Sequence, residues 1–156
     1  MIVRLTCPEM LQAAMAGIMR RVESVKLQRR DLLPVKADPW GADVEGALAE
    51  CALAKGLGVY WAGKGIFRGG DVGALQVRST PRADGCLLLQ PDDDDDAMFW
   101  LVTGAMGFYV LRGCIRGRDG KRDEWWEHKP GTHRAAFYVP QSALIEADAE
   151  PVERAA

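Results

Sequence analysis

The sequence is poor in the residues that build zinc sites and disulfide frameworks. It has four cysteines and two histidines, and no two cysteines form a Cys-x-x-Cys pair. The spacing therefore offers no zinc motif and gives no indication of an exported, disulfide-stapled fold. Ser79 and Thr80 have no histidine near them in the sequence, so a serine hydrolase gains no support either.

Long apolar runs are missing as well. No stretch approaches the ~20 residues that a membrane-spanning helix needs, and the start "MIVRLTCPEM" lacks the layout of a signal peptide. We therefore expect a cytoplasmic protein without a membrane partner. Large charge of one sign is also lacking, since the net charge is −2. That value predicts no strong overall attraction to nucleic acid, although it leaves room for a local basic face.

The residues that are present suit one globular domain. A chain of 156 residues with 48% hydrophobic content can bury a usable core. We expect a single domain over residues 1–146, with an N-terminal helix and loop in 1–42 and a core in 43–146. Residues 147–156 read as a flexible tail.

The first helix has a clear start signal. Thr6 and Glu9 have the spacing of a capping box, in which each side chain satisfies a backbone amide of the other. We expect the helix to run to about Arg30. Its apolar residues recur at helical spacing and form a stripe of Leu11, Met15, Ile18, Met19, Val22 and Val25.

A second helix is predicted from about Val44 to Leu57, with Asp43 as its cap. Nearly all its side chains are small or apolar, which is typical of a helix buried between layers. From Val59 onward the pattern changes to short strand-like runs separated by glycine, proline and aspartate. These runs are "GVYWAG", "GALQVRST", "GCLLLQ", "AMFWLVTG", "GFYVLRGCIRG" and "RAAFYVPQ".

The spacing of these runs favours an antiparallel meander, interrupted by the polar loop "RDGKRDEWWEHKPGTH". "IVRL" near the start could add a short strand. Helices followed by strands predict the α+β class, with a central mixed sheet and the N-terminal helices packed on it.

One group of polar residues could form a metal site. Glu50 shares a helix face with leucines, where a carboxylate needs a partner, a proton or a metal. Strand alternation makes Gln76 and Arg78 project together, and Asp71 lies in the glycine-flanked turn before them. Oxygen ligands of this kind suit Mg²⁺. The alternatives are an ion-paired Glu50 at the helix edge and an ordinary turn leading into a solvated strand.

The order of these pieces resembles the PD-(D/E)XK superfamily of restriction-endonuclease-like nucleases. Gly46 and Glu50 match its Gly-x-x-x-Glu helix, Asp71 its aspartate, and Gln76 and Arg78 its (D/E/Q)-x-K strand. Segments of the second half, such as "FYVLRGCIRGRDG", also look like those of small uncharacterised phage and prophage proteins of this group. The likeness covers roughly residues 43–145.

The resemblance implies a Mg²⁺- or Mn²⁺-dependent deoxyribonuclease, with Glu50, Asp71 and Gln76 at the metal and Arg78 on the phosphate. DNA would then be the partner, and a homodimer is possible because the superfamily often dimerises. Two letters depart from the pattern. Arg78 keeps its proton and cannot act as a general base, and the neutral Gln76 weakens metal binding. The expected activity is therefore that of a phage-type nuclease or of a weak, degenerate descendant.

Two further charged groups stand out. The run Asp92–Asp96 is expected to repel itself and to form a solvated loop, with Ca²⁺ binding as the alternative. The last third gathers basic residues beside two tryptophans, which suits phosphate contacts and base stacking. The alternative for this group is a solvated loop whose tryptophans cover the core or a partner. Its members are Arg112, Arg116, Arg118, Lys121, Arg122, Trp125, Trp126, Lys129 and Arg134.

Two non-enzymatic alternatives remain at this point. The chain could be a phage accessory protein that uses the same scaffold to bind nucleic acid or a phage or host protein. It could also be a virion or assembly component.

Overall fold

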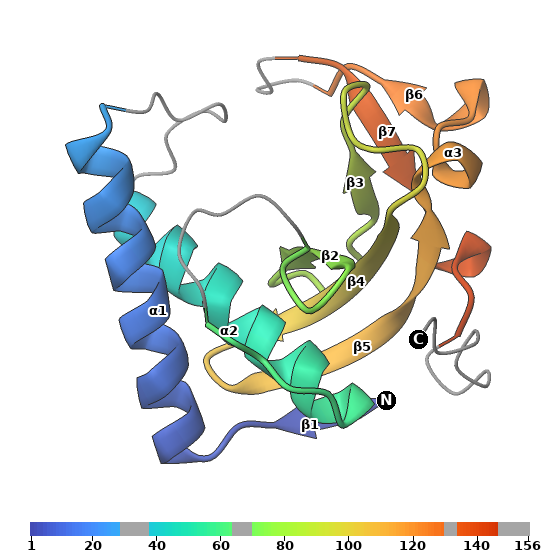
Figure 1. Cartoon of the computed structure of the whole chain (residues 1–156). Helices are drawn as coiled ribbons and strands as arrows, with labels where there is room; N and C mark the ends of the chain where they lie inside the picture. The colour runs from blue at the N-terminus through green and yellow to red at the C-terminus, as the bar shows by residue number, and fades with distance from the viewer. Residues whose placement is uncertain (29–37, 64–69, 130–133, 147–156) are drawn as a thin grey trace.

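The computed structural model describes residues 1–28, 38–63, 70–129 and 134–146 and has an α+β architecture (Figure 1). Two N-terminal helices pack on one face of a four-stranded mixed sheet, sheet A, whose strand order is β1-β5-β4-β2. A three-stranded sheet, sheet B, has the order β3-β7-β6 and packs on part of the other face. This confirms the expected class, with a mixed sheet and N-terminal helices.

The elements follow one another along the chain with short connections. They are β1 (Ile2–Arg4), α1 (Cys7–Lys26), α2 (Pro39–Leu57), β2 (Leu75–Thr80), β3 (Leu87–Leu89), β4 (Met98–Ala105), β5 (Phe108–Arg116), α3 (Gly117–Gly120), η1 (Asp123–Trp125), β6 (Trp126–Glu127), β7 (Ala136–Val139) and η2 (Gln141–Ala143). No helix in the described ranges is long and apolar enough to cross a membrane.

Helix α1 starts at the predicted capping box. The Thr6 amide donates to Glu9 Oε2 at 2.6 Å, and the Thr6 hydroxyl accepts from the Glu9 amide at 3.5 Å. The helix ends at Lys26, a little before the expected end, and Arg30 lies outside the described residues. The face of α1 that meets α2 is built from small residues, including Ala13 and Gly17. The apolar stripe predicted from the sequence lies on the opposite face and is exposed.

Helix α2 begins five residues before the predicted start. Asp38, not Asp43, caps it, because Asp38 Oδ1 accepts from the Gly41 amide at 2.9 Å and Pro39 occupies the first turn. Gly58, at φ +65°, ends the helix in the left-handed conformation that glycine adopts without strain. Every residue from 47 to 54 is buried, which confirms the expectation of a helix covered on all sides.

The expected antiparallel meander is wrong. Strand β2 pairs parallel with β4, and the segment between them leaves sheet A to place β3 in sheet B. The apolar side chains of Leu87 and Leu89 explain this departure, because β3 pairs with β7 and buries them against the sheet A core. Residues 58–63 form no strand, and the expected polar loop contains α3, η1 and β6 among its described residues.

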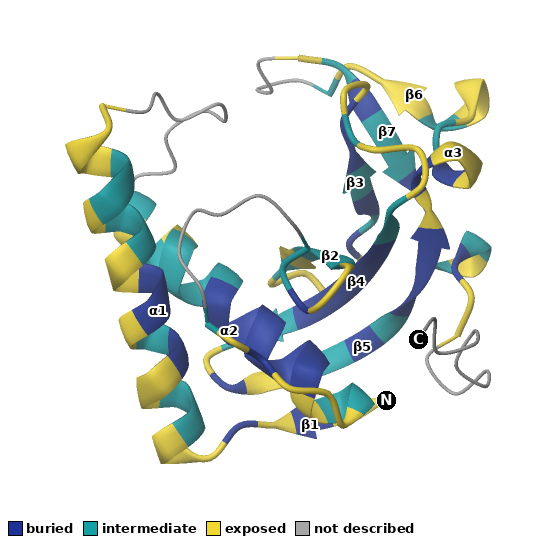
Figure 2. Ribbon diagram, viewed as in Figure 1, coloured by how far each residue is buried: buried dark blue, intermediate teal, exposed yellow. Residues whose placement is uncertain are grey.

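Sheet A therefore carries a separate core on each face (Figure 2). The helix-side face packs against α1 and α2 and includes Trp100 and Val102 of β4. The far face packs against sheet B and includes Phe99 and Leu101 of the same strand. This alternation decides which polar side chains of the strands can meet Glu50.

Candidate functional site

Glu50 is buried in an ion pair with a residue that the motif does not contain. Arg20 of α1 donates from Nη1 to Glu50 Oε1 at 2.5 Å and from Nη2 to Glu50 Oε2 at 2.6 Å. Trp61 Nε1 adds a third donor at 3.2 Å from Glu50 Oε2. The glutamate side chain is 7% exposed, so the pair lies between the two helices, away from bulk water. The arrangement is the bidentate fork that guanidinium and carboxylate groups favour.

The two partners of this pair influence each other's protonation. Burial raises the pKa of Glu50, and the hydrogen bonds and charge of Arg20 oppose that rise. The hydrogen bonds to Glu50 in turn raise the pKa of Arg20 above its usual range. The Asp71 carboxylate lies close enough to act on both groups, because its charge raises both pKa values. Glu50 and Asp71 therefore share one neighbourhood on the helix side of sheet A.

Asp71 also has a structural partner of its own. Its Oδ2 accepts a hydrogen bond from the Val77 amide at 2.7 Å, and its amide donates to the Leu75 carbonyl. Gly73, at φ +61°, turns the chain between these contacts. Asp71 thus holds the tight turn that leads into β2, which is the ordinary turn considered as an alternative for this aspartate.

Gln76 and Arg78 project from the opposite face of sheet A. Gln76 pairs in register with Phe99 and Arg78 with Leu101, and both of those residues belong to the far-side core. The Arg78 guanidinium lies 5.0 Å from the Phe99 ring centroid and donates to Asp93 Oδ1 at 2.8 Å. The neighbouring Val77 packs instead with the helix-side core. The strand therefore separates the two halves of the predicted site.

The four residues expected to converge do so only in pairs. Glu50 and Asp71 lie on the helix side, and Gln76 and Arg78 lie on the far side. Both oxygens of Glu50 accept from Arg20, and one oxygen of Asp71 accepts from a backbone amide. This set of donors does not fit a Mg²⁺ or Mn²⁺ ion, which requires several oxygens directed at one point. Within the described ranges, no group of three or more His, Cys, Asp or Glu side chains could hold a metal ion.

The aspartate run (residues 92–96) is a structured loop and not a free solvated one. Its side chains are matched by basic residues from four different segments of the chain. Arg78 pairs with Asp93 and Lys121 with Asp95, and the lysine ammonium lowers the pKa of Asp95. Lys121 also donates to the Asp93 carbonyl at 2.5 Å. Basic side chains thus relieve the repulsion that a Ca²⁺ ion was considered to relieve.

The remaining basic residues of the last third are also largely engaged. Arg118 and Arg116 both pair with Asp96, the latter at 3.8 Å, and Arg134 pairs with Asp92 at 3.5 Å. Arg122 pairs with Glu124 at 3.7 Å and lies 4.9 Å from the Trp125 ring centroid. Lys129 pairs with Glu127 and stacks on Tyr138. These contacts neutralise much of the basic surface that the sequence suggested for DNA.

The two tryptophans have different environments. Trp125 packs against the far-side core under Arg122, so its ring is engaged within the chain. Trp126 is 45% exposed, and its ring contacts Phe137 at a centroid distance of 4.7 Å. Only Trp126 of the pair therefore presents a large exposed surface.

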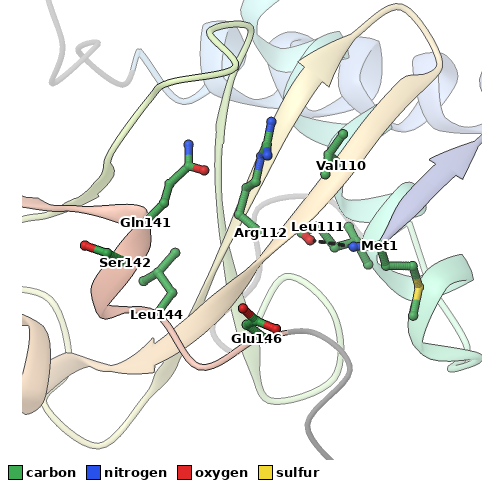
Figure 3. Close-up of a pocket in the computed structure, with 8 residues that line it drawn as sticks. All are labelled: Met1, Val110, Leu111, Arg112, Gln141, Ser142, Leu144 and Glu146. Atoms are coloured by element: carbon green, nitrogen blue, oxygen red, sulfur yellow. Dashed lines mark hydrogen bonds between the residues drawn. The ribbon is translucent and has the colours of Figure 1, made fainter.

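Arg112 lies apart from the other basic residues, in an open groove of about 390 Å³ beside β5 (Figure 3). Its Nε donates to the buried Thr103 hydroxyl at 2.7 Å, which fixes the side chain on the sheet. The groove is lined by Met1, Val110, Leu111, Arg112, Gln141, Ser142, Leu144 and Glu146. A positive and a negative side chain thus share the groove, which gives it no strong preference for an anion.

Arg20 and Trp61 are the two residues of the Glu50 cluster that the sequence reasoning missed. A signal for Arg20 was present, because Asp43 and Glu50 are two helical turns apart and lie on one face of α2. The adjacent Arg20 and Arg21 of α1 meet these two carboxylates, and Arg21 Nε donates to Asp43 Oδ2 at 2.6 Å. No local pattern could have found Trp61, which lies beyond the end of α2. No protein-family model, curated protein or solved structure matches the chain.

Proposed function

We propose that this chain is a non-enzymatic accessory protein of phage type, which binds another protein on a nuclease-like scaffold. The observation that carries the proposal is the bidentate contact between Arg20 and Glu50. The guanidinium occupies both carboxylate oxygens that a nuclease would direct at its metal. The arginine thus supplies the positive charge that Glu50 needs when it is buried.

The position of β2 supports the same proposal. A metal-dependent nuclease needs its helix glutamate and its strand residues on one side of the sheet, so that all of them reach the same ion. Here Gln76 and Arg78 face the sheet B core, and Glu50 faces the helices. The Arg78 side chain is also committed to Asp93 and Phe99.

The electrostatics favour a protein over a nucleic acid as the partner. A DNA-binding surface needs unpaired lysines and arginines that can displace counterions from phosphates. In this chain the aspartate run takes up Arg78, Arg116, Arg118, Lys121 and Arg134. The net charge of −2 adds no attraction at long range.

The test combines metal binding with a cleavage assay. Calorimetric titration with Mg²⁺ and Mn²⁺ should give no binding heat, and supercoiled plasmid should remain intact with either ion. The same results are expected for the Gln76→Glu/Arg78→Lys double variant, because restoring the motif letters does not bring that face of β2 to Glu50.

Nicking by the wild type that disappears in Glu50→Gln, but persists in the exposed control Asp84→Asn, would overturn the proposal. New metal binding and cleavage in the double variant would also contradict it, and would favour a weakened nuclease.

A further inference from the structure

Helix α1 turns its most apolar face away from the rest of the chain. Figure 2 shows the outer side of α1 exposed along its length, while its buried residues face α2. Leu11 is 67% exposed and Val25 is 61% exposed, values that are unusual for large aliphatic side chains gathered on one helix face. The exposed apolar residues of this face, called here the α1 seam, are Leu11, Met15, Ile18, Met19, Val22 and Val25.

The spacing of the α1 seam is that of a helix made to pair with another helix. Leu11, Met15, Ile18, Val22 and Val25 follow one another at intervals of four, three, four and three residues. This alternation is the heptad pattern that keeps one narrow stripe facing a partner helix. The stripe extends over roughly 21 Å of the helix.

The α1 seam carries no charge that would oppose pairing with a copy of itself. The only charged residues between Met10 and Val22 are Arg20 and Arg21, and both donate inward to Glu50 and Asp43 of α2. A face with exposed charges of one sign would repel its own copy, whereas this face meets it without that cost. A charged partner such as nucleic acid would find nothing on it to pair with.

The ends of α1 have opposite charges. Glu9 lies in the first turn of the helix and Lys26 in its last turn. An antiparallel pair places the lysine of each copy beside the acidic end of the other and opposes the two helix dipoles. A parallel pair would bring like charges together at both ends. Charge complementarity thus selects the antiparallel arrangement.

We propose that the protein forms a two-fold symmetric homodimer through the α1 seam, with the two α1 helices antiparallel and the axis passing between Met15 and Ile18. Leu11 of each copy packs beside Val22 of the other. The contact of two helices lies at the small end of specific interfaces, so the dimer is in rapid exchange with monomer and has a Kd of roughly 1–100 μM. This proposal does not depend on the absence of catalysis.

Sedimentation equilibrium of the full chain tests the proposal. The wild type should be dimeric at concentrations above its Kd, and Ile18→Glu should weaken association at least 100-fold, because it buries a carboxylate next to the two-fold axis. Ile145→Glu is the matched control, since Ile145 is 50% exposed and lies in the segment that pairs with Cys114 of β5. The control should dimerise like the wild type, and circular dichroism melts should show that both variants fold.

A thiol crosslink tests the orientation without a change in the seam. Cys7 is exposed at the start of α1, and in the antiparallel dimer the two Cys7 thiols lie roughly 28 Å apart along the axis. A short bismaleimide should therefore fail to link two wild-type chains but should link Cys7 to the new thiol of Lys26→Cys in the other copy. Adding Cys7→Ser to that variant should abolish the link.

A wild type that is monomeric at about 1 mM would overturn the proposal. So would a dimer that Ile18→Glu leaves intact, or wild-type chains linked Cys7 to Cys7, which would indicate a parallel pair. A monomer that binds phosphatidylcholine vesicles, and loses that binding in Ile18→Glu, would assign the seam to a lipid surface instead.

Discussion

The ion pair of Arg20 and Glu50 joins the two helices at a point that water hardly reaches. A buried pair of this kind contributes little compared with well-packed apolar residues, but the loss of one member strands a charge in the interior. The contribution of Arg20 to stability therefore depends on whether Glu50 is still present.

Arg20→Met should lower the free energy of unfolding by about 3–5 kcal/mol at pH 7, because it leaves the Glu50 carboxylate buried without a counterion. The double variant Arg20→Met/Glu50→Leu should recover most of this loss. Urea unfolding of the wild type, both single variants and the double variant measures the coupling. A double variant as unstable as Arg20→Met would show that the pair is not the source of the loss.

The capping glutamate of α1 predicts a pH dependence of stability. A hydrogen bond from Lys55, together with one from the Thr6 amide, lowers the pKa of Glu9 from 4.5 to about 2. Since the folded state favours the ionised form, the stabilisation is present above pH 4.5 and is lost as the pH falls from 4.5 towards 2.

The stability of Glu9→Gln should therefore be lower than that of the wild type at pH 7, and the two should approach each other near pH 2. Lys55→Met should remove the larger part of the effect while the capping box remains. Unfolding by urea across this pH range gives the comparison, and parallel pH profiles for wild type and Glu9→Gln would contradict the assignment.

At the scale of elements, the approach of α1 to α2 depends on one glycine. A Cβ built on Gly17 would lie 2.6 Å from the Asp43 carbonyl oxygen and 2.6 Å from Val44 Cα, both of which are backbone atoms of α2. The two helices could accept such a methyl group only by moving apart. Gly46 in the middle of α2 is different, because a Cβ there would meet no atom within 4 Å.

Gly17→Ala should destabilise the fold by about 1–3 kcal/mol, because it overpacks the contact between the helices. Gly46→Ala should stabilise it by about 0.5–1 kcal/mol, because alanine loses less backbone freedom in a helix interior. Thermal and urea unfolding of the two variants should show opposite signs. Equal effects would mean that the helices do not approach as closely at Gly17 as described.

The sequence predicted those elements whose signals are local. The capping box at Thr6 and the glycine stop at Gly58 follow from neighbouring residues, and both are present. The start of α2 was misplaced because Asp43 and Asp38 are both acceptable caps, and only the contact of Asp43 with Arg21 distinguishes them. The parallel pairing of β2 with β4 has no local signal at all.

The candidate site illustrates the same limit. Alternation along β2 predicted that Gln76 and Arg78 share a face, and the register with β4 agrees. Which face meets the helices depends on where α2 packs, and the residue pattern of one strand does not contain that information. The partner of Glu50 could not be read from the motif either, because Arg20 lies on a different helix.

At the scale of the whole molecule, the aspartate run acts on a basic surface assembled from distant segments. Replacing Asp92, Asp95 and Asp96 by asparagine would release Arg116, Arg118, Lys121 and Arg134 from their ion pairs. A surface with four released cations should attract the DNA backbone without regard to sequence.

The triple variant should bind a fluorescent DNA duplex at low salt, and log K should fall with log salt with a slope of about −3 to −4. The wild type should bind far more weakly. Asp84→Asn/Asp119→Asn/Asp123→Asn is the control, since it changes the net charge equally outside the run. Equal binding by the two triple variants would mean that net charge alone is responsible.

Sheet B has a consequence for how the chain is made. The β4–β5 hairpin joins neighbouring segments and can form early, whereas β3 must wait for β7, its partner in the described residues, which is synthesised much later. Until β7 and Leu144 emerge from the ribosome, the far-side residues Phe99 and Leu101 have no complete cover. Pulse-labelled hydrogen exchange during refolding should protect the Val102 amide before that of Tyr138. The far face is then the surface through which nascent chains are most prone to aggregate or to recruit a chaperone.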